Sequence, residues 1–173
     1  MTRSIYVGAW RVDLDVRPDV RSPLDGAALA RVIAAALDAV GAPAPASIAL
    51  VLSDDAELAA LNAEHMGVAG PTDVLSFPLL PPDAFRRAAP FPEQPRPPRT
   101  RLHLGDIVVS VERAIDQAES GRGGHTGDVR WSAADELRLL VTHGTLHVCG
   151  WDHADPADEA EMRALERSLL AAR

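Results

Sequence analysis

Residues 131–153, WSAADELRLLVTHGTLHVCGWDH, predict a buried helix at the centre of the fold. Ser132 and Asp135 have the spacing of a helix capping box, although Glu is the preferred residue at the second position. The apolar residues that follow are Leu137, Leu140, Val141, Leu146 and Val148. A helix that is apolar on most of its surface belongs inside a core, and a glycine such as Gly150 commonly ends it. We therefore expect a central helix from about Ser132 to Gly150.

Three histidines in this stretch have the spacing of a metal site. His143 and His147 are four residues apart, so on a helix both imidazoles project from one face, with Cβ atoms about 6 Å apart. His153 follows six residues later, and Gly150 permits the chain reversal that would bring it back to the same point. Three imidazoles with one vacant position are typical of a catalytic zinc site, where bound water becomes acidic. The trio therefore predicts one zinc ion, and nickel also suits imidazole ligands.

The other candidate ligands are interpreted differently. Cys149 lies two residues after His147, so on a helix it points to another side, and we interpret it as a buried thiol. The remaining histidines, His65, His103 and His125, are separate in the sequence and are interpreted as surface or hydrogen-bonding residues.

Gly144 separates this pattern from the helix of zinc proteases. In the H-E-x-x-H motif the Glu acts as the base that takes a proton from bound water, and here Gly144 stands at its position. A glycine inside a helix costs about 1 kcal/mol relative to alanine. We therefore expect the backbone or a substrate to approach closely at Gly144, and a zinc protease remains only a third alternative.

The rest of the chain predicts an α+β fold in a single domain over residues 1–173. Strands are expected at 4–16, 47–52, 73–79 and 103–111, which gives three or four strands. About five helices are expected, over 23–41, after Ser53, around 114–118, from Ser132 and from Asp155. Residues 81–101 are rich in proline and arginine and lack an apolar period, so we expect a long surface loop.

Composition limits the possible roles. The chain has 173 residues with 17 basic and 25 acidic side chains, a net charge of −8, so any contact with nucleic acid must be local. A single cysteine excludes an internal disulfide framework and favours a reducing compartment. We find no secretory signal, and prolines and Asp38 interrupt the most apolar window, so we expect no membrane span.

Three ordered motifs resemble the YbeY family of bacterial endoribonucleases and rRNA maturation factors. Residues 143–153, HGTLHVCGWDH, resemble the family's H-G-x-L-H-L-x-G-[YH]-D-H signature. Residues 71–78, PTDVLSFP, and 104–107, LGDI, match two further blocks in order and spacing. The resemblance implies a mixed sheet with a zincin-like metal helix, and a metal held by His143, His147 and His153. It also implies cleavage of single-stranded RNA in 3′-end maturation of small-subunit rRNA and in ribosome quality control, in the cytoplasm and with the small ribosomal subunit and its proteins as partners.

The same motifs supply candidates for the remaining roles. His143, His147 and Asp73 are the catalytic candidates, although Asp73 and Asp106 are equally suited to hold a zinc ligand or a turn by hydrogen bonding. Asp152 is expected to orient an imidazole or to cap the last helix. The candidates for RNA contact are Thr72, Ser76, Arg99 and Arg101. Met66 stands where family members commonly carry an arginine. Either an arginine of the 86–101 segment substitutes for it, or the positioning of phosphate depends more on the metal.

A second class of function stays open at this point. A ribosome-assembly factor that binds RNA without cleaving it, with a structural metal, is favoured by the net acidity and by Met66. The open three-histidine pattern favours the enzyme instead.

Overall fold

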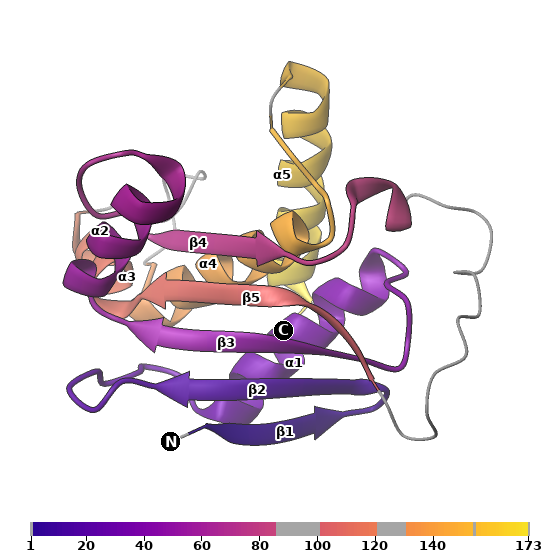
Figure 1. Cartoon of the computed structure of the whole chain (residues 1–173), viewed down its shortest axis with the longest axis horizontal. Coiled ribbons are helices and arrows are strands. Elements are labelled where there is room, and N and C mark those ends of the chain that lie inside the picture. Colours follow the sequence, from indigo (N-terminus) through magenta and orange to yellow (C-terminus); the bar gives the residue numbers. More distant parts are fainter. Residues whose placement is uncertain (1, 86–100, 121–130, 154, 173) are drawn as a thin grey trace.

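A mixed five-stranded sheet forms the centre of the structure (Figure 1). The computed structural model describes residues 2–85, 101–120, 131–153 and 155–172. The strands, in the order β1-β2-β3-β5-β4 across the sheet, are β1 (Arg3–Val7), β2 (Trp10–Val16), β3 (Ala46–Ser53), β4 (Val74–Pro78) and β5 (Leu102–Ser110). β2, β3 and β5 are parallel, whereas β1 and β4 run antiparallel to their neighbours. The α+β prediction is confirmed, and β4 forms one edge of the sheet.

The prediction of three or four strands was too low by at least one. Residues 4–16, predicted as one strand, form the hairpin of β1 and β2, in which Val7 pairs with Trp10 across a two-residue turn. Gly8 in that turn has φ +56°, in the left-handed region that glycine enters without steric cost. The strand-like residues on both sides of Gly8 hid this turn from a pattern based on residue type.

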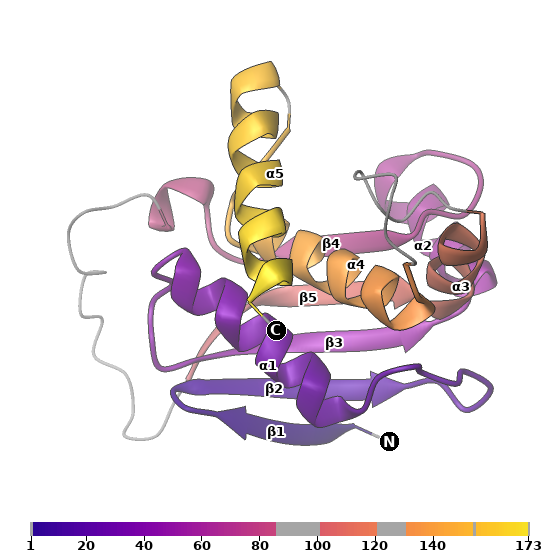
Figure 2. The same ribbon diagram turned by 180° about the vertical axis from the view of Figure 1, so that it is seen from behind.

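Helices cover mainly one face of the sheet (Figure 2). α1 (Gly26–Ala39) and α4 (Ala133–Val148) pack on this face, and α3 (Val111–Glu119) packs against α4. On the other face, Leu58 of α2 (Asp55–Leu61) packs against Leu75 and Val108. A π-helical turn, η1 (Asn62–Met66), continues α2, and a 3-10 turn, η2 (Pro82–Ala84), follows β4. Residues 86–100, most of the predicted proline- and arginine-rich loop, lie outside the described residues.

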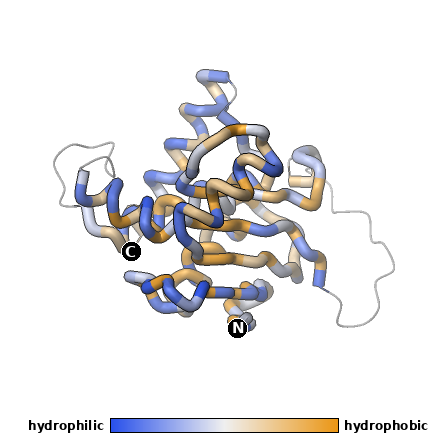
Figure 3. The backbone as a smooth tube through the Cα atoms, turned by 60° about the vertical axis from the view of Figure 1, so that its left-hand side comes forward, coloured by the Kyte–Doolittle hydropathy of each residue, from blue (hydrophilic) through white to orange (hydrophobic). Residues whose placement is uncertain are grey.

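α5 (Pro156–Ala171) packs against α4 and projects beyond the rest of the molecule (Figures 1 and 2). Hydrophilic residues recur along its length (Figure 3). Only two of its residues, Met162 and Glu166, are buried. α5 therefore contributes little apolar surface to the core.

The helices begin at or near the residues that the sequence predicts. The capping box of Ser132 and Asp135 is present with both hydrogen bonds, and Asp155 caps α5 with Pro156 in its first turn. Asp152 is not that cap, because its carboxylate accepts a hydrogen bond from the backbone amide of His153. α1 begins after Asp25, three residues later than predicted, and α2 begins after Asp54, one residue later than predicted.

The buried central helix is confirmed. Leu137, Val141 and Val148 of α4 are fully buried in the main core, together with residues of α1 and the sheet. None of the described helices is long and apolar enough to cross a membrane.

Candidate metal centre

The side chains of His143, His147 and His153 converge at one point. Each offers a ring nitrogen, and these atoms all lie within 4.8 Å of one another. The Nε2 atoms of His143 and His147 are 3.0 Å apart. Two zinc–nitrogen bonds of about 2.0–2.1 Å at a tetrahedral angle would place their nitrogens about 3.3 Å apart. The donor set and its spacing therefore fit a divalent ion such as zinc.

Gly150 produces the reversal that brings His153 back. Its φ is +77°, and its amide donates to the carbonyl of His147 at 3.0 Å, while the Trp151 amide donates to the carbonyl of Leu146. A Cβ atom at Gly150 would lie 2.7 Å from Cα of Pro82, so a larger residue would meet backbone there. The turn is thus both left-handed and closely packed, and only glycine fits it.

The neutral form of His147 is favoured by its surroundings. Burial, reinforced by repulsion from His143 and His153, lowers the pKa of His147 from 6.5 to about 4, against a backbone hydrogen bond with Trp151. Metal ions bind the neutral imidazole. The fold therefore keeps the His147 imidazole, at neutral pH, in the neutral form that can bind a metal ion.

Cys149 is excluded from this cluster by its position. The residue is 1% exposed and packs in the main core. Burial raises the pKa of its thiol to about 12. Among the described residues, the cluster of side chains that could hold a metal ion contains three histidines and no cysteine. The interpretation of Cys149 as a buried thiol is therefore confirmed.

An open groove of about 520 Å³ lies beside the histidines. His143, His147 and His153 form one side, and the other side comes from the segment before β4 and from β4 itself, including Thr72, Asp73 and Ser76. Met66 also lines the groove and is 50% exposed. The 71–78 segment and the histidine segment, which are far apart in the sequence, thus line the same groove. The three histidines form one of its walls.

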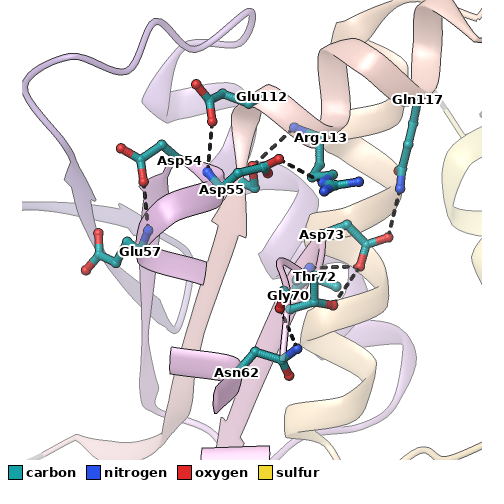
Figure 4. Close-up of polar contacts among 12 residues, drawn as sticks. Asp54, Asp55, Glu57, Asn62, Gly70, Thr72, Asp73, Glu112, Arg113 and Gln117 are labelled. Atoms are coloured by element: carbon teal, nitrogen blue, oxygen red, sulfur yellow. Dashed lines mark hydrogen bonds and ion pairs between the residues drawn. The ribbon is translucent and has the colours of Figure 1, made fainter. Parts of the chain in front are cut away.

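Asp73 is held at the junction between this groove and a second cavity of about 340 Å³. Its Oδ1 accepts a hydrogen bond from the Val74 amide at 2.9 Å, and its Oδ2 accepts one from Gln117 Nε2 at 3.2 Å (Figure 4). In the same view, Asn62 donates to the carbonyl of Gly70 and so fixes the preceding loop. The carboxylate is therefore oriented by α3 and by its own turn while it faces both cavities.

Ser76 and Thr72 lie in the groove, but Ser76 already has a structural bond. Its hydroxyl donates to the carbonyl of Gly144 at 3.0 Å and ties β4 to α4. The Thr72 hydroxyl donates to Oδ1 of Asp73 at the longer distance of 3.4 Å. Of this pair, Thr72 has the hydroxyl that is freer to meet a substrate.

Arg101, predicted to contact RNA, does not lie near the histidines. Arg101 donates to the carbonyl of Ala9, and its guanidinium lies 5.5 Å from the centre of the Tyr6 ring, at the β1–β2 hairpin. This hairpin is at the opposite edge of the sheet from β4. Arg99 lies outside the described residues.

The other acidic and histidine candidates have separate partners. Asp106 and His103 bond to each other at 2.8 Å, and His103 also contacts Ser47. His65 makes an edge contact with the Phe77 ring, whereas His125 is outside the described residues. Asp106 therefore does not accompany the three histidines.

Glu166 was missed by the sequence analysis. Its Oε1 lies 2.7 Å from Nδ1 of His143, and the residue is 6% exposed. The signal was present, since Glu166 follows Met162 by four residues and shares the buried stripe of α5. An acidic residue in an otherwise apolar stripe marks a position with a polar partner.

Known proteins resemble this chain in sequence and in fold. The family model described as Endoribonuclease YbeY matches residues 21–173. A protein named Endoribonuclease YbeY from Roseiflexus sp. is 39% identical over 163 residues, 93% of this chain and 91% of the relative. A protein of the same name from Thermobifida fusca is also 39% identical, over 92% of this chain and 93% of its own. A solution structure of a Thermotoga maritima protein is similar in fold, with a TM-score of 0.51 and 21% identity, covering 91% of this chain and 86% of the other.

Proposed function

The chain belongs to the YbeY family of endoribonucleases, and on that premise we propose that it cleaves single-stranded RNA at the groove beside His143, His147 and His153. The observation that carries the proposal is the convergence of these three imidazoles on one point at the wall of an open groove. These three histidines would hold a divalent ion, and the groove that they line is open to water and to a phosphate oxygen.

The chemistry assigned to the metal is that of a divalent ion with imidazole ligands. When bound, zinc would supply Lewis acidity to a phosphoryl oxygen and lower the pKa of bound water, and nickel would suit the same ligands. The protein contributes the positions of the ligands, because His143 and His147 belong to a buried helix and His153 follows the tightly packed turn at Gly150.

Asp73 is our candidate for the group that accepts a proton during cleavage. It faces the groove together with His143 and His153, and the Val74 amide and Gln117 fix its carboxylate. A proton acceptor must be within hydrogen-bond reach of its donor in the complex with substrate. The Asp73→Asn variant should therefore lose cleavage while it still binds the metal.

RNA contact is assigned to the part of the groove around Thr72, whose hydroxyl can donate to a phosphate oxygen. Ser76 shapes the groove by holding β4 against α4. Arg99 remains a candidate for phosphate contact from the 86–100 segment. Arg101 takes no part in this assignment because the hairpin residues Ala9 and Tyr6 engage its guanidinium.

The cellular role that we propose is 3′-end maturation of small-subunit rRNA and ribosome quality control in the cytoplasm. The names of the relatives support a nuclease, and maturation of rRNA follows from the family. The small ribosomal subunit and its proteins are then the expected partners.

The experiment compares cleavage of single-stranded rRNA fragments by the wild type, His147→Ala and a control, His103→Ala. His103 is a histidine on β5 that bonds to Asp106 and Ser47 instead of to the cluster. We expect His147→Ala and chelator treatment to abolish cleavage, zinc to restore the chelated wild type, and His103→Ala to cleave normally. Equal cleavage by the wild type and His147→Ala would exclude the nuclease proposal.

That last outcome would support an assembly factor that binds RNA without cleaving it. The net charge of −8 and the apolar Met66 in the groove favour this second candidate. The zinc-protease alternative has less support, because Gly144 occupies the position of the catalytic glutamate and packs against the sheet.

A further inference from the structure

Glu166 is a buried carboxylate with an unusual position in the fold. It is one of the two buried residues of α5, and it lies at the interface with α4. Its Oε1 is 2.7 Å from Nδ1 of His143. An ionised carboxylate can only accept hydrogen bonds, so the proton in this contact belongs to Nδ1 of His143.

The surroundings of Glu166 do little to stabilise a buried carboxylate. The cavity beside Glu166 is also lined by Asp73, Glu136 and Glu159. Arg163 lines it too, but its guanidinium forms an ion pair with Glu159, with an N–O distance of 2.6 Å. Within the described part of the chain, the Glu166 carboxylate contacts His143. Burying a carboxylate without a full cationic partner costs free energy, and an apolar side chain of similar size often serves stability better.

The contact instead has the arrangement that a metal ligand requires. With its proton on Nδ1, His143 has its lone pair on Nε2, and this is the atom that lies 3.0 Å from Nε2 of His147. A carboxylate behind a ligating imidazole selects the tautomer, fixes the ring plane and increases the basicity of the ligand. The nearby negative charge of Glu166 would also favour a cation in the cluster.

We propose that Glu166 is a positioning residue of the metal centre, which holds His143 with Nε2 directed at the ion and so couples the docking of α5 on α4 to metal binding. The inference rests on the metal site of the proposed function. It adds that α5, which buries little apolar surface, is retained against α4 in part by this bond. Metal binding should therefore stabilise the packing of α5 on α4 as well as the positions of the three histidines.

The test measures Zn²⁺ affinity by competition with a chromophoric chelator, and Co²⁺ absorption as a report on ligand geometry. The variants are Glu166→Leu, which keeps the volume but removes the acceptor, and Glu166→Gln, which keeps an acceptor but removes the charge. Glu161→Gln, an exposed residue of the same helix, is the matched control. We expect Zn²⁺ to bind about 10–100-fold more weakly to Glu166→Leu, less weakly to Glu166→Gln, and normally to Glu161→Gln.

The metal-free proteins separate a positioning role from a structural one. Because replacing a buried carboxylate by an apolar group is often neutral or stabilising, metal-free Glu166→Leu should unfold at the same temperature as the metal-free wild type or at a higher one. Zn²⁺ should then raise the unfolding temperature of Glu166→Leu less than that of the wild type.

Unchanged Zn²⁺ affinity in both Glu166 variants would overturn the inference and leave the nuclease proposal intact. If Glu166→Leu does not fold, Glu166→Gln alone decides by the same measurement. A wild-type protein that binds neither Zn²⁺ nor Co²⁺ would instead remove the metal site, and with it both proposals.

Discussion

Gly144 lies directly against Ile107, so that a Cβ atom on Gly144 would be 2.8 Å from Cγ2 of the isoleucine. The same atom would lie 3.0 Å from Cγ2 of Val74 and 3.2 Å from Oγ of Ser76. α4 therefore crosses β4 and β5 at a distance that only glycine permits. This close approach places His143 and His147, on either side of Gly144 in the sequence, beside the β4 segment that forms the groove.

Gly144→Ala should destabilise the protein although alanine is the better helix former. Helix propensity favours the substitution by about 1 kcal/mol, but overpacking a close contact costs about 1–3 kcal/mol. The β-branched neighbours Ile107 and Val74 have little rotamer freedom to move away. We expect a net loss of up to about 2 kcal/mol in urea unfolding.

Ser168→Ala, at an exposed position of α5, is the control that changes helix propensity without this contact. An increase in stability of Gly144→Ala by about 1 kcal/mol would show that the helix and the sheet separate easily.

The sequence predicted those parts of the molecule that depend on local periodicity. The buried α4, its capping box, the α5 cap at Asp155 and the inward position of Cys149 all follow from residue spacing along one helix. The spacing of the three histidines led to the expectation that they would meet, because one helix and one turn connect them.

The features that were not predicted depend on contacts between distant segments. The bond between Glu166 and His143 joins two helices, and neither residue identifies the other in the sequence. The cost of Gly144 was recognised, but only the packing of β4 and β5 shows what lies against it. Arg101 was assigned to RNA by charge alone, whereas its position is determined by the hairpin turn that begins at Gly8.

Glu57 should make the stability of the protein depend on acid pH. It forms a two-point contact with Arg17, in which Nε donates to Oε2 at 2.7 Å, and Ser53 also donates to the carboxylate. These bonds, first that with Arg17, lower the pKa of Glu57 from 4.5 to about 2. A carboxyl with a lowered pKa stabilises the folded state above its unfolded pKa and loses this contribution as the pH falls through its folded pKa.

Glu57→Gln should therefore be less stable than the wild type at neutral pH, and the difference should decrease between about pH 4.5 and pH 2. Urea unfolding across this range measures the difference, and because other acids titrate in both proteins, their contributions cancel. A difference that is constant down to pH 2 would show that packing, instead of charge, accounts for the effect of the substitution.

Cys149 should not react with alkylating reagents in the folded protein. The thiolate is the reactive form, and a pKa of about 12 leaves very little of it at neutral pH, while burial blocks access. Iodoacetamide labelling followed by mass spectrometry should be slow in the native state and fast in denaturant. Protection that disappears when zinc is removed would instead indicate that Cys149 is part of the metal centre.

Met66→Arg should strengthen the binding of single-stranded RNA. Met66 lines the same groove as the three histidines and is half exposed. A guanidinium there would be able to form paired hydrogen bonds with a phosphate, which a thioether cannot. Each phosphate contact on a single strand steepens the dependence of log K on log salt by about 0.7, so the gain in affinity should be largest at low salt.

Val68→Arg is the matched control, because it adds the same charge at an exposed position two residues away that does not line the groove. Binding is measured by fluorescence anisotropy in the His147→Ala background, where the RNA is expected to stay intact. The two variants share any gain that arises from net charge, so only a direct phosphate contact makes Met66→Arg bind more tightly and with the steeper salt dependence. Equal gains in both variants would place the RNA backbone outside this groove.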